Sequence, residues 1–243
     1  MVGEATADTA PTLGAARTGW RRFFLPVTYG YAAMLITVAA LLAALSDAAQ
    51  TQVILRASTN LSNLLRGNYG TLVSSALVVG DGAAAALLIP LLVCLLALAE
   101  RRFGALTTIR IFVAGHIGAT LLVAAGLWVA VTADWVPVST TTAEDVGISY
   151  GAMAVIGAFV VLLPRRWRAT WSITWLAVAV SGVAMGRTFT NVGHLLALAI
   201  GLVVAFWLLR TQRVRLPRLH RMTRFECGLL AVASALGYLL LVG

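Results

Sequence analysis

The chain has 243 residues, of which 60% are hydrophobic and 11% are charged, and its mean hydropathy is +0.91. A soluble domain carries about a quarter charged residues, so this composition excludes an ordinary soluble globular protein. Every basic residue is arginine and the formal net charge is +9, but the arginines stand in short clusters between apolar runs. That pattern is typical of a membrane protein and argues against a nucleic-acid partner. We therefore expect an all-α, polytopic transmembrane helical bundle.

Apolar runs near the length that crosses a bilayer, about 20 residues, recur along the whole chain. Helices are the expected form, because a lipid-exposed backbone has to satisfy its own hydrogen bonds and nothing here alternates as barrel strands do. Seven spans are predicted, at residues 24–45, 76–99, 106–132, 146–163, 169–186, 191–209 and 225–242.

The chain divides into three parts. Residues 1–23 form a cytoplasmic tail, residues 24–210 form the membrane domain, and residues 211–243 supply a basic cytoplasmic loop and an additional helix. The connection 46–75 is long enough to contain structure of its own. We expect an amphipathic segment there at the membrane interface, whose apolar residues face lipid: Ile54, Leu55, Leu61, Leu64 and Leu65.

The arginines predict the orientation of the spans. Fifteen of the 18 fall in the tail and in alternate connections, and the other three are Arg56, Arg66 and Arg187. Because cytoplasmic loops are enriched in arginine and lysine, the N-terminus is predicted to be cytoplasmic and the C-terminus external. The expected location is the plasma membrane, with membrane lipids as direct partners.

The cysteines and histidines do not predict a metal or a cofactor. Cys94 and Cys227 lie in apolar surroundings and are expected to pack as small hydrophobic residues. His116, His194 and His220 are scattered and have no acidic partners within the spans, so no metal and no cofactor is expected. His116 is interpreted as a structural hydrogen-bonding residue.

Ser149 and His194 are the candidate catalytic residues. The predicted topology places each about one turn from the external end of an inward-running span, so the two lie at a similar depth. A serine and a histidine within hydrogen-bond reach form a catalytic dyad, in which the imidazole takes the hydroxyl proton and the alkoxide attacks a carbonyl.

Small residues in both spans favour close helix packing. Gly151 follows Gly147 by four positions, and Gly193, Ala197 and Gly201 recur at the same spacing. Such runs let two helix backbones approach closely, which brings side chains beside them together.

These motifs resemble the rhomboid family of intramembrane serine proteases. The nucleophile motif is matched by Gly147-Ile148-Ser149-Tyr150-Gly151, the base motif by Gly193-His194-Leu195-Leu196-Ala197, and a Glu-x-x-x-Gly turn by Glu100 to Gly104. The resemblance covers the first six spans and implies a rhomboid-like six-helix core, to which the C-terminal span adds a seventh helix. It also implies Ser149 as nucleophile and His194 as base.

The departures from the family pattern leave two functions open. Tyr150 stands where the family has glycine, and its ring is expected to face lipid or line the substrate cleft. Ala84 and Leu88 stand where active members carry a His and an Asn that stabilise the oxyanion. Gly147, Tyr150 and Asn191 are the candidate supporting or oxyanion residues.

The first function is an intramembrane serine protease that cleaves transmembrane segments near the external membrane boundary. In that case Ser181, Gly182 and Gly186 of the fifth span are expected to form the substrate gate. The second is a catalytically inactive rhomboid-like protein that binds membrane segments of partner proteins. A transporter is disfavoured, because the sequence has no internal repeat.

Overall fold

The computed structural model describes residues 24–80, 82–186, 188–211 and 222–242. The predicted cytoplasmic tail, Arg187 and most of the predicted basic loop, at residues 212–221, lie outside the described residues.

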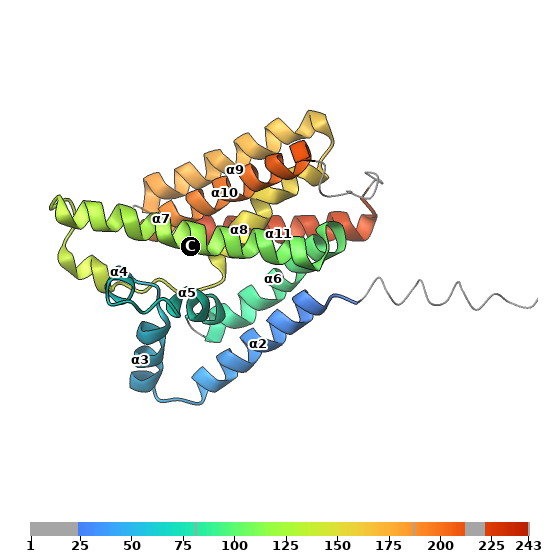
Figure 1. The fold of residues 1–243 in the computed structure, drawn as a ribbon. Helices are drawn as coiled ribbons and strands as arrows, with labels where there is room; N and C mark the ends of the chain where they lie inside the picture. The colour runs from blue at the N-terminus through green and yellow to red at the C-terminus, as the bar shows by residue number, and fades with distance from the viewer. Residues whose placement is uncertain (1–23, 81, 187, 212–221, 243) are drawn as a thin grey trace, which may run out of the picture.

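Six helices of the described residues are long and apolar enough to cross a membrane. They run side by side in Figure 1 and are α2 (Pro26–Ala43), α6 (Gly82–Phe103), α7 (Ala105–Thr132), α9 (Arg165–Gly186), α10 (Phe189–Thr211) and α11 (Arg224–Val242). No strand occurs in the described part of the chain. The prediction of an all-α polytopic bundle is confirmed.

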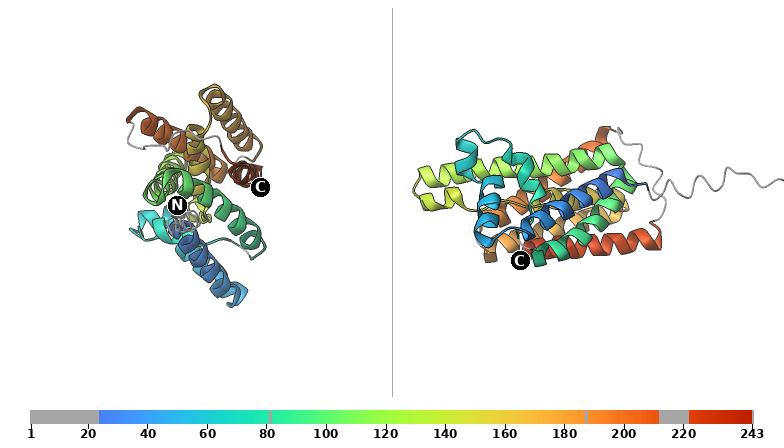
Figure 2. Two further views of the ribbon diagram at one scale, coloured as in Figure 1. Left: turned by 90° about the vertical axis from the view of Figure 1, so that its right-hand side faces the viewer. Right: turned by 90° about the horizontal axis from the view of Figure 1, so that it is seen from below.

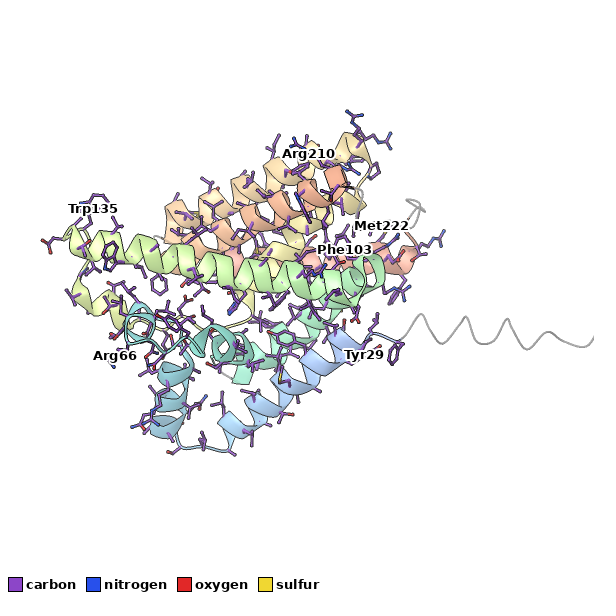
Figure 3. All side chains as sticks on the ribbon, viewed as in Figure 1. Tyr29, Arg66, Phe103, Trp135, Arg210 and Met222 are labelled. Carbon is purple, nitrogen blue, oxygen red and sulfur yellow. The ribbon has the colours of Figure 1, made fainter. Side chains whose placement is uncertain are left out.

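Six of the described arginines lie at the end of α6, the start of α9 and the end of α10, at one end of the bundle that we call the basic end: Arg101, Arg102, Arg165, Arg166, Arg168 and Arg210. In Figure 3, Arg210, Phe103, Met222 and Tyr29 are labelled toward this end, and Trp135 and Arg66 toward the other, which we call the loop end.

The fourth predicted span is shorter than expected. Instead of crossing over residues 146–163, the chain forms α8 (Ser149–Ala158), continued by the 3-10 turn η4 (Phe159–Leu162). Fourteen helical residues are too few to span a bilayer. The remaining depth is covered by an irregular segment that descends from the loop end, after the 3-10 turn η3 (Val138–Thr142). The predicted fourth span is therefore a short apolar helix, and the residues that the structure describes hold six helices long enough to cross a membrane.

Hydrogen bonds to other loops make this irregular descent possible. The Asp145 N–H donates to Ser58 Oγ at 2.8 Å, and the Asp145 carbonyl accepts from the Thr59 N–H at 3.0 Å. The Gly147 N–H donates to the Ser75 carbonyl at 2.8 Å. Non-helical backbone inside a membrane domain is tolerated where protein groups satisfy it in this way.

The long connection after α2 contains four short helical elements: α3 (Asp47–Ala57), α4 (Leu61–Leu65), α5 (Thr71–Ser74) and η2 (Ser75–Leu77). Leu55 and Leu65 are exposed, as expected of lipid-facing residues, but Ile54 and Leu61 are each only 5% exposed. Ile54 packs with Leu42 and Val78. The prediction that Ile54 and Leu61 face lipid is wrong, because the connection folds inward onto the helices instead of lying flat on the membrane.

Helix α8 is the centre of the core, and every one of its residues after Ser149 is buried. It packs on α7 and α10, and small residues permit the close approach. A methyl group at Gly201 of α10 would overlap the Ala154 carbonyl, and one at Gly115 of α7 would overlap the Ala154 side chain. The small residues therefore place α8 directly between two long helices.

Carboxylates fix two helices at the basic end. The buried Glu100 of α6 accepts hydrogen bonds from the Val27 N–H, the Thr28 N–H and the Thr28 hydroxyl, at 3.1, 2.8 and 2.8 Å. It thereby caps the start of α2, whose first N–H groups have no partners within the helix. At the start of α11, Glu226 pairs with Arg102 of α6 at 2.6 Å.

Candidate functional site

Polar side chains gather in the interior where α8 begins. Ser149 is the first residue of α8 and is half-buried, and His194 lies in the second turn of α10 and is 4% exposed. Tyr150, the residue after Ser149, contacts both His194 and its neighbour Gly193. Ser149 and His194 therefore lie at the same level of the bundle.

Tyr150 is the side chain that meets His194. The two rings are 5.5 Å apart, centroid to centroid, and nearly perpendicular at 78°, which is a favourable edge-to-face arrangement. A methyl group at Gly193 would overlap the Tyr150 ring. Tyr150 is 3% exposed, so it neither faces lipid nor lines an open cleft, contrary to the expectation from sequence.

His194 has no hydrogen-bond partner on either ring nitrogen among the residues that the structure describes. No hydrogen bond therefore joins Ser149 to His194 in this conformation. The catalytic roles of Ser149 and His194 stay a prediction. A buried imidazole with both nitrogens unpaired is unusual, since buried polar groups in proteins nearly always have a partner.

A second Ser–His pair lies on the other side of Tyr150. Ser75 Oγ of η2 is 3.2 Å from His116 Nε2 of α7, and both side chains are buried. The His116 ring lies 6.4 Å from the Tyr150 ring, centroid to centroid. This hydrogen bond agrees with a structural role for His116. No sequence spacing could identify Ser75 as the partner of His116, because the long connection after α2 folds inward to bring Ser75 there.

Unpaired polar atoms are concentrated around Tyr150. Besides both nitrogens of His194, the Tyr150 hydroxyl, His116 Nδ1 and the Thr120 hydroxyl of α7 are buried and have no hydrogen-bond partner in the described part of the chain. The otherwise apolar interior between α7, α8 and α10 therefore holds several polar atoms without internal hydrogen bonds.

The loop before α8 contains Gly147, one of the predicted supporting residues. Gly147 has a φ of +121°, a conformation that favours glycine. Its N–H donates to the Ser75 carbonyl at 2.8 Å.

Asn191, the third predicted supporting residue, joins two helices. Its side-chain amide donates to the Gly182 carbonyl of α9 at 2.9 Å. The predicted packing residues lie in the helix contacts around α8. Gly151 contacts the Phe112 ring, Gly201 contacts Ala154, and Ala197 is fully buried.

A cleft of about 710 Å³ reaches His194 from between α9, α10 and α11. We call it the His194 cleft. Its wall combines apolar side chains with a few polar ones, namely Ser181, Thr188, Thr190 and Asn191. Mixed lining of this kind, with convergent polar groups, is typical of a binding site. Ser181, Gly182 and Gly186, the predicted gate residues, all lie in this wall.

The fold and the interior site define a polytopic helical membrane protein with a short central helix and a buried polar centre. A family model of rhomboid-like proteins matches residues 22–214. Because the match covers most of the chain, the protein belongs to the rhomboid-like family. No curated protein and no solved structure matches the chain.

Proposed function

We propose that this chain is a rhomboid-like protein that binds transmembrane segments of partner proteins and does not cleave them. The observation that carries the proposal is the contact between Tyr150 and His194. The ring of Tyr150 fills the space beside His194 and Gly193, and neither nitrogen of His194 receives the Ser149 hydroxyl.

The candidate oxyanion donors are already engaged in other hydrogen bonds, and this supports the same proposal. The Gly147 N–H already donates to the Ser75 carbonyl, and the Asn191 amide already donates to the Gly182 carbonyl. Loss of one oxyanion donor lowers the rate of acyl transfer by about 10²–10³-fold. A cleaving enzyme would have to break these bonds or recruit other donors.

The His194 cleft is the proposed place of partner binding. It opens between helices of the bundle, and its hydroxyl and amide groups can hydrogen-bond the backbone of a segment that is not fully helical. The arginine distribution further supports a cytoplasmic basic end and an external loop end, and we propose the plasma membrane as the location.

A fluorophosphonate probe, which labels activated serines, tests the proposal on the purified full chain in mild detergent. We expect no labelling of the wild type. Labelling that disappears in both Ser149→Ala and His194→Ala would overturn the proposal. Segment binding is tested in parallel by photo-crosslinking from Met185, in the cleft wall, to a panel of single-span membrane proteins; the absence of any crosslinked partner would also count against it.

One observation favours an intramembrane serine protease as the second candidate. Both nitrogens of His194 are free of other hydrogen bonds among the described residues, so the Ser149 hydroxyl would meet no competing hydrogen-bond partner once the Tyr150 ring had moved aside. In that case partner binding in the cleft would precede assembly of the dyad, and labelling would appear only in the presence of a bound segment.

A further inference from the structure

A pocket of about 240 Å³ lies between α2 and α7 and shares no lining residue with the His194 cleft. Helix α2 packs mainly on α6, and α2 and α7 diverge from the basic end toward the loop end (Figure 1). The short elements α5 and η2 fill part of the gap, through Leu72, Val73, Ala76 and Leu77. We call the space that stays open the α2–α7 pocket.

The wall of the α2–α7 pocket is apolar apart from two side chains. The Tyr31 hydroxyl donates to the Ala76 carbonyl, and His116 is the other polar residue of the lining. A buried water needs two to four polar partners, and apolar cavities stay dry. Water is therefore a poor occupant of this pocket.

The pocket opens on the surface that faces lipid. Four residues of its wall are large, apolar and exposed, namely Met34, Val73, Ile109 and Val113. In a membrane the molecules that meet such an opening are lipids, whose acyl chains are as apolar as the pocket. The chemistry of the lining therefore fits an acyl chain.

The dimensions of the pocket fit one chain of a single leaflet. Along α7 the wall runs from Ile109 to Ile117, which is about 12 Å of helix, and half of the hydrocarbon core of a bilayer is about 15 Å. A cavity of about 150 Å³ holds benzene, so this pocket has room for on the order of ten carbon atoms. Because Val27 and Ile109 lie in the first turns of their helices, the chain belongs to the leaflet at the basic end.

Arg110 supplies a positive charge for the headgroup of the same lipid. It directly follows Ile109 in α7, its side chain is exposed, and it forms no ion pair with any residue that the structure describes. An arginine side chain extends along apolar surface to reach the headgroup region, and its planar guanidinium matches the geometry of a phosphate. Charge complementarity therefore favours an anionic phospholipid.

The inner end of the pocket touches the residues that support α8. His116 lines the pocket, and its Nε2 is 3.2 Å from Ser75 Oγ. The Ser75 carbonyl accepts the hydrogen bond from the Gly147 N–H in the irregular descent to α8. An acyl chain in the pocket thus packs against the connection on which the start of α8 rests.

We propose that the α2–α7 pocket binds one acyl chain of an anionic phospholipid from the leaflet at the basic end, with the phosphate of that lipid on Arg110. The bound lipid completes the packing between α2 and α7 that the polypeptide leaves unfinished. This site is independent of partner binding in the His194 cleft.

Photo-crosslinking of the full chain in phosphatidylcholine nanodiscs tests the site. The nanodiscs contain a small fraction of phosphatidylglycerol with a photoreactive diazirine near the end of one acyl chain, and peptide mass spectrometry locates the crosslinks. We expect crosslinks at residues 72–77 and 109–117 of the wild type. Val113→Trp fills the pocket and should lower their yield at least about fivefold. Leu122→Trp, at an exposed position of α7 outside the pocket, is the matched control and should keep the wild-type yield.

The headgroup is tested with photoreactive phosphatidylcholine that carries the same chains. The wild type should give a lower yield with this lipid than with phosphatidylglycerol, and Arg110→Gln should remove the difference. Arg66→Gln, at an exposed arginine of the loop end, is the matched control and should preserve it.

Equal yields at these residues from Val113→Trp and Leu122→Trp would overturn the proposal, as would crosslinks spread evenly along the lipid-facing side of α7, because bulk lipid gives both results. Equal yields with the two headgroups in the wild type would overturn the assignment of an anionic lipid. If Val113→Trp prevents folding, Met34→Trp replaces it from the opposite wall, with the same expected loss of crosslinks.

Discussion

Tyr150 shows how a single residue decides the character of this interior. It lies between His116 and His194, and its ring contacts both imidazoles at 6.4 and 5.5 Å, centroid to centroid. The family pattern has a glycine at this position, and a glycine would leave the space beside His194 empty. The buried ring holds α8 and α10 together where a nucleophile and its base are otherwise expected.

Gly201 tests the close approach of α8 and α10. In Gly201→Ala the added methyl group meets the Ala154 backbone, which cannot move aside as a flexible side chain can. Overpacking of this kind typically costs about 1–3 kcal/mol. Gly126→Ala on α7, where nothing lies within 4 Å of the added methyl group, is the matched control. The melting temperature should fall for Gly201→Ala and hold for Gly126→Ala; equal values for both would contradict the prediction.

Among the helices, α2 and α8 depend on their surroundings in different ways. Helix α2 lies at the edge of the bundle, as Figure 2 shows, and buries only Thr28, Leu35 and Leu42. Its attachment at the basic end relies on Glu100. Helix α8 has no lipid-facing surface and is held by packing along its whole length.

Glu100→Ala should detach the start of α2. Three hydrogen-bond donors at Val27 and Thr28 lose their acceptor, and hydrogen bonds to a charged group contribute about 1.5–3 kcal/mol each. Amide hydrogen exchange should rise at residues 27–30 and stay unchanged in α10. Glu144→Ala removes an exposed acid and should leave exchange in α2 unaltered; protection of α2 in Glu100→Ala equal to that of the wild type would argue against the cap.

For the whole molecule, the irregular descent and α8 together act as one crossing, so α2 and α11 start at the same end and run in parallel (Figure 1). If the basic end is cytoplasmic, as the arginines predict, the C-terminus is external. Alkaline phosphatase fused to the C-terminus should then be active, and a fluorescent protein fused there should be non-fluorescent. A fusion after Thr211, at the basic end, should show the reverse, and an inactive C-terminal phosphatase would refute this orientation.

The sequence by itself determined the class of protein, the approximate position of every long helix and the small residues through which they pack. Hydrophobic length and arginine clusters are local properties, and lipid enforces helices wherever an apolar run crosses it. These features also sufficed for the resemblance that the family match now bears out.

The tertiary structure alone decided which side chains meet in the interior. One position along a helix turns the side-chain direction by about 100°, so sequence could align Ser149 with the depth of His194 but could not tell that Tyr150 would face it. The Ser75–His116 pair and the short α8 depend on loops that fold inward, and the position of α11 depends on packing between α6 and α9. Such contacts join residues far apart in the chain, and only the complete bundle brings them together.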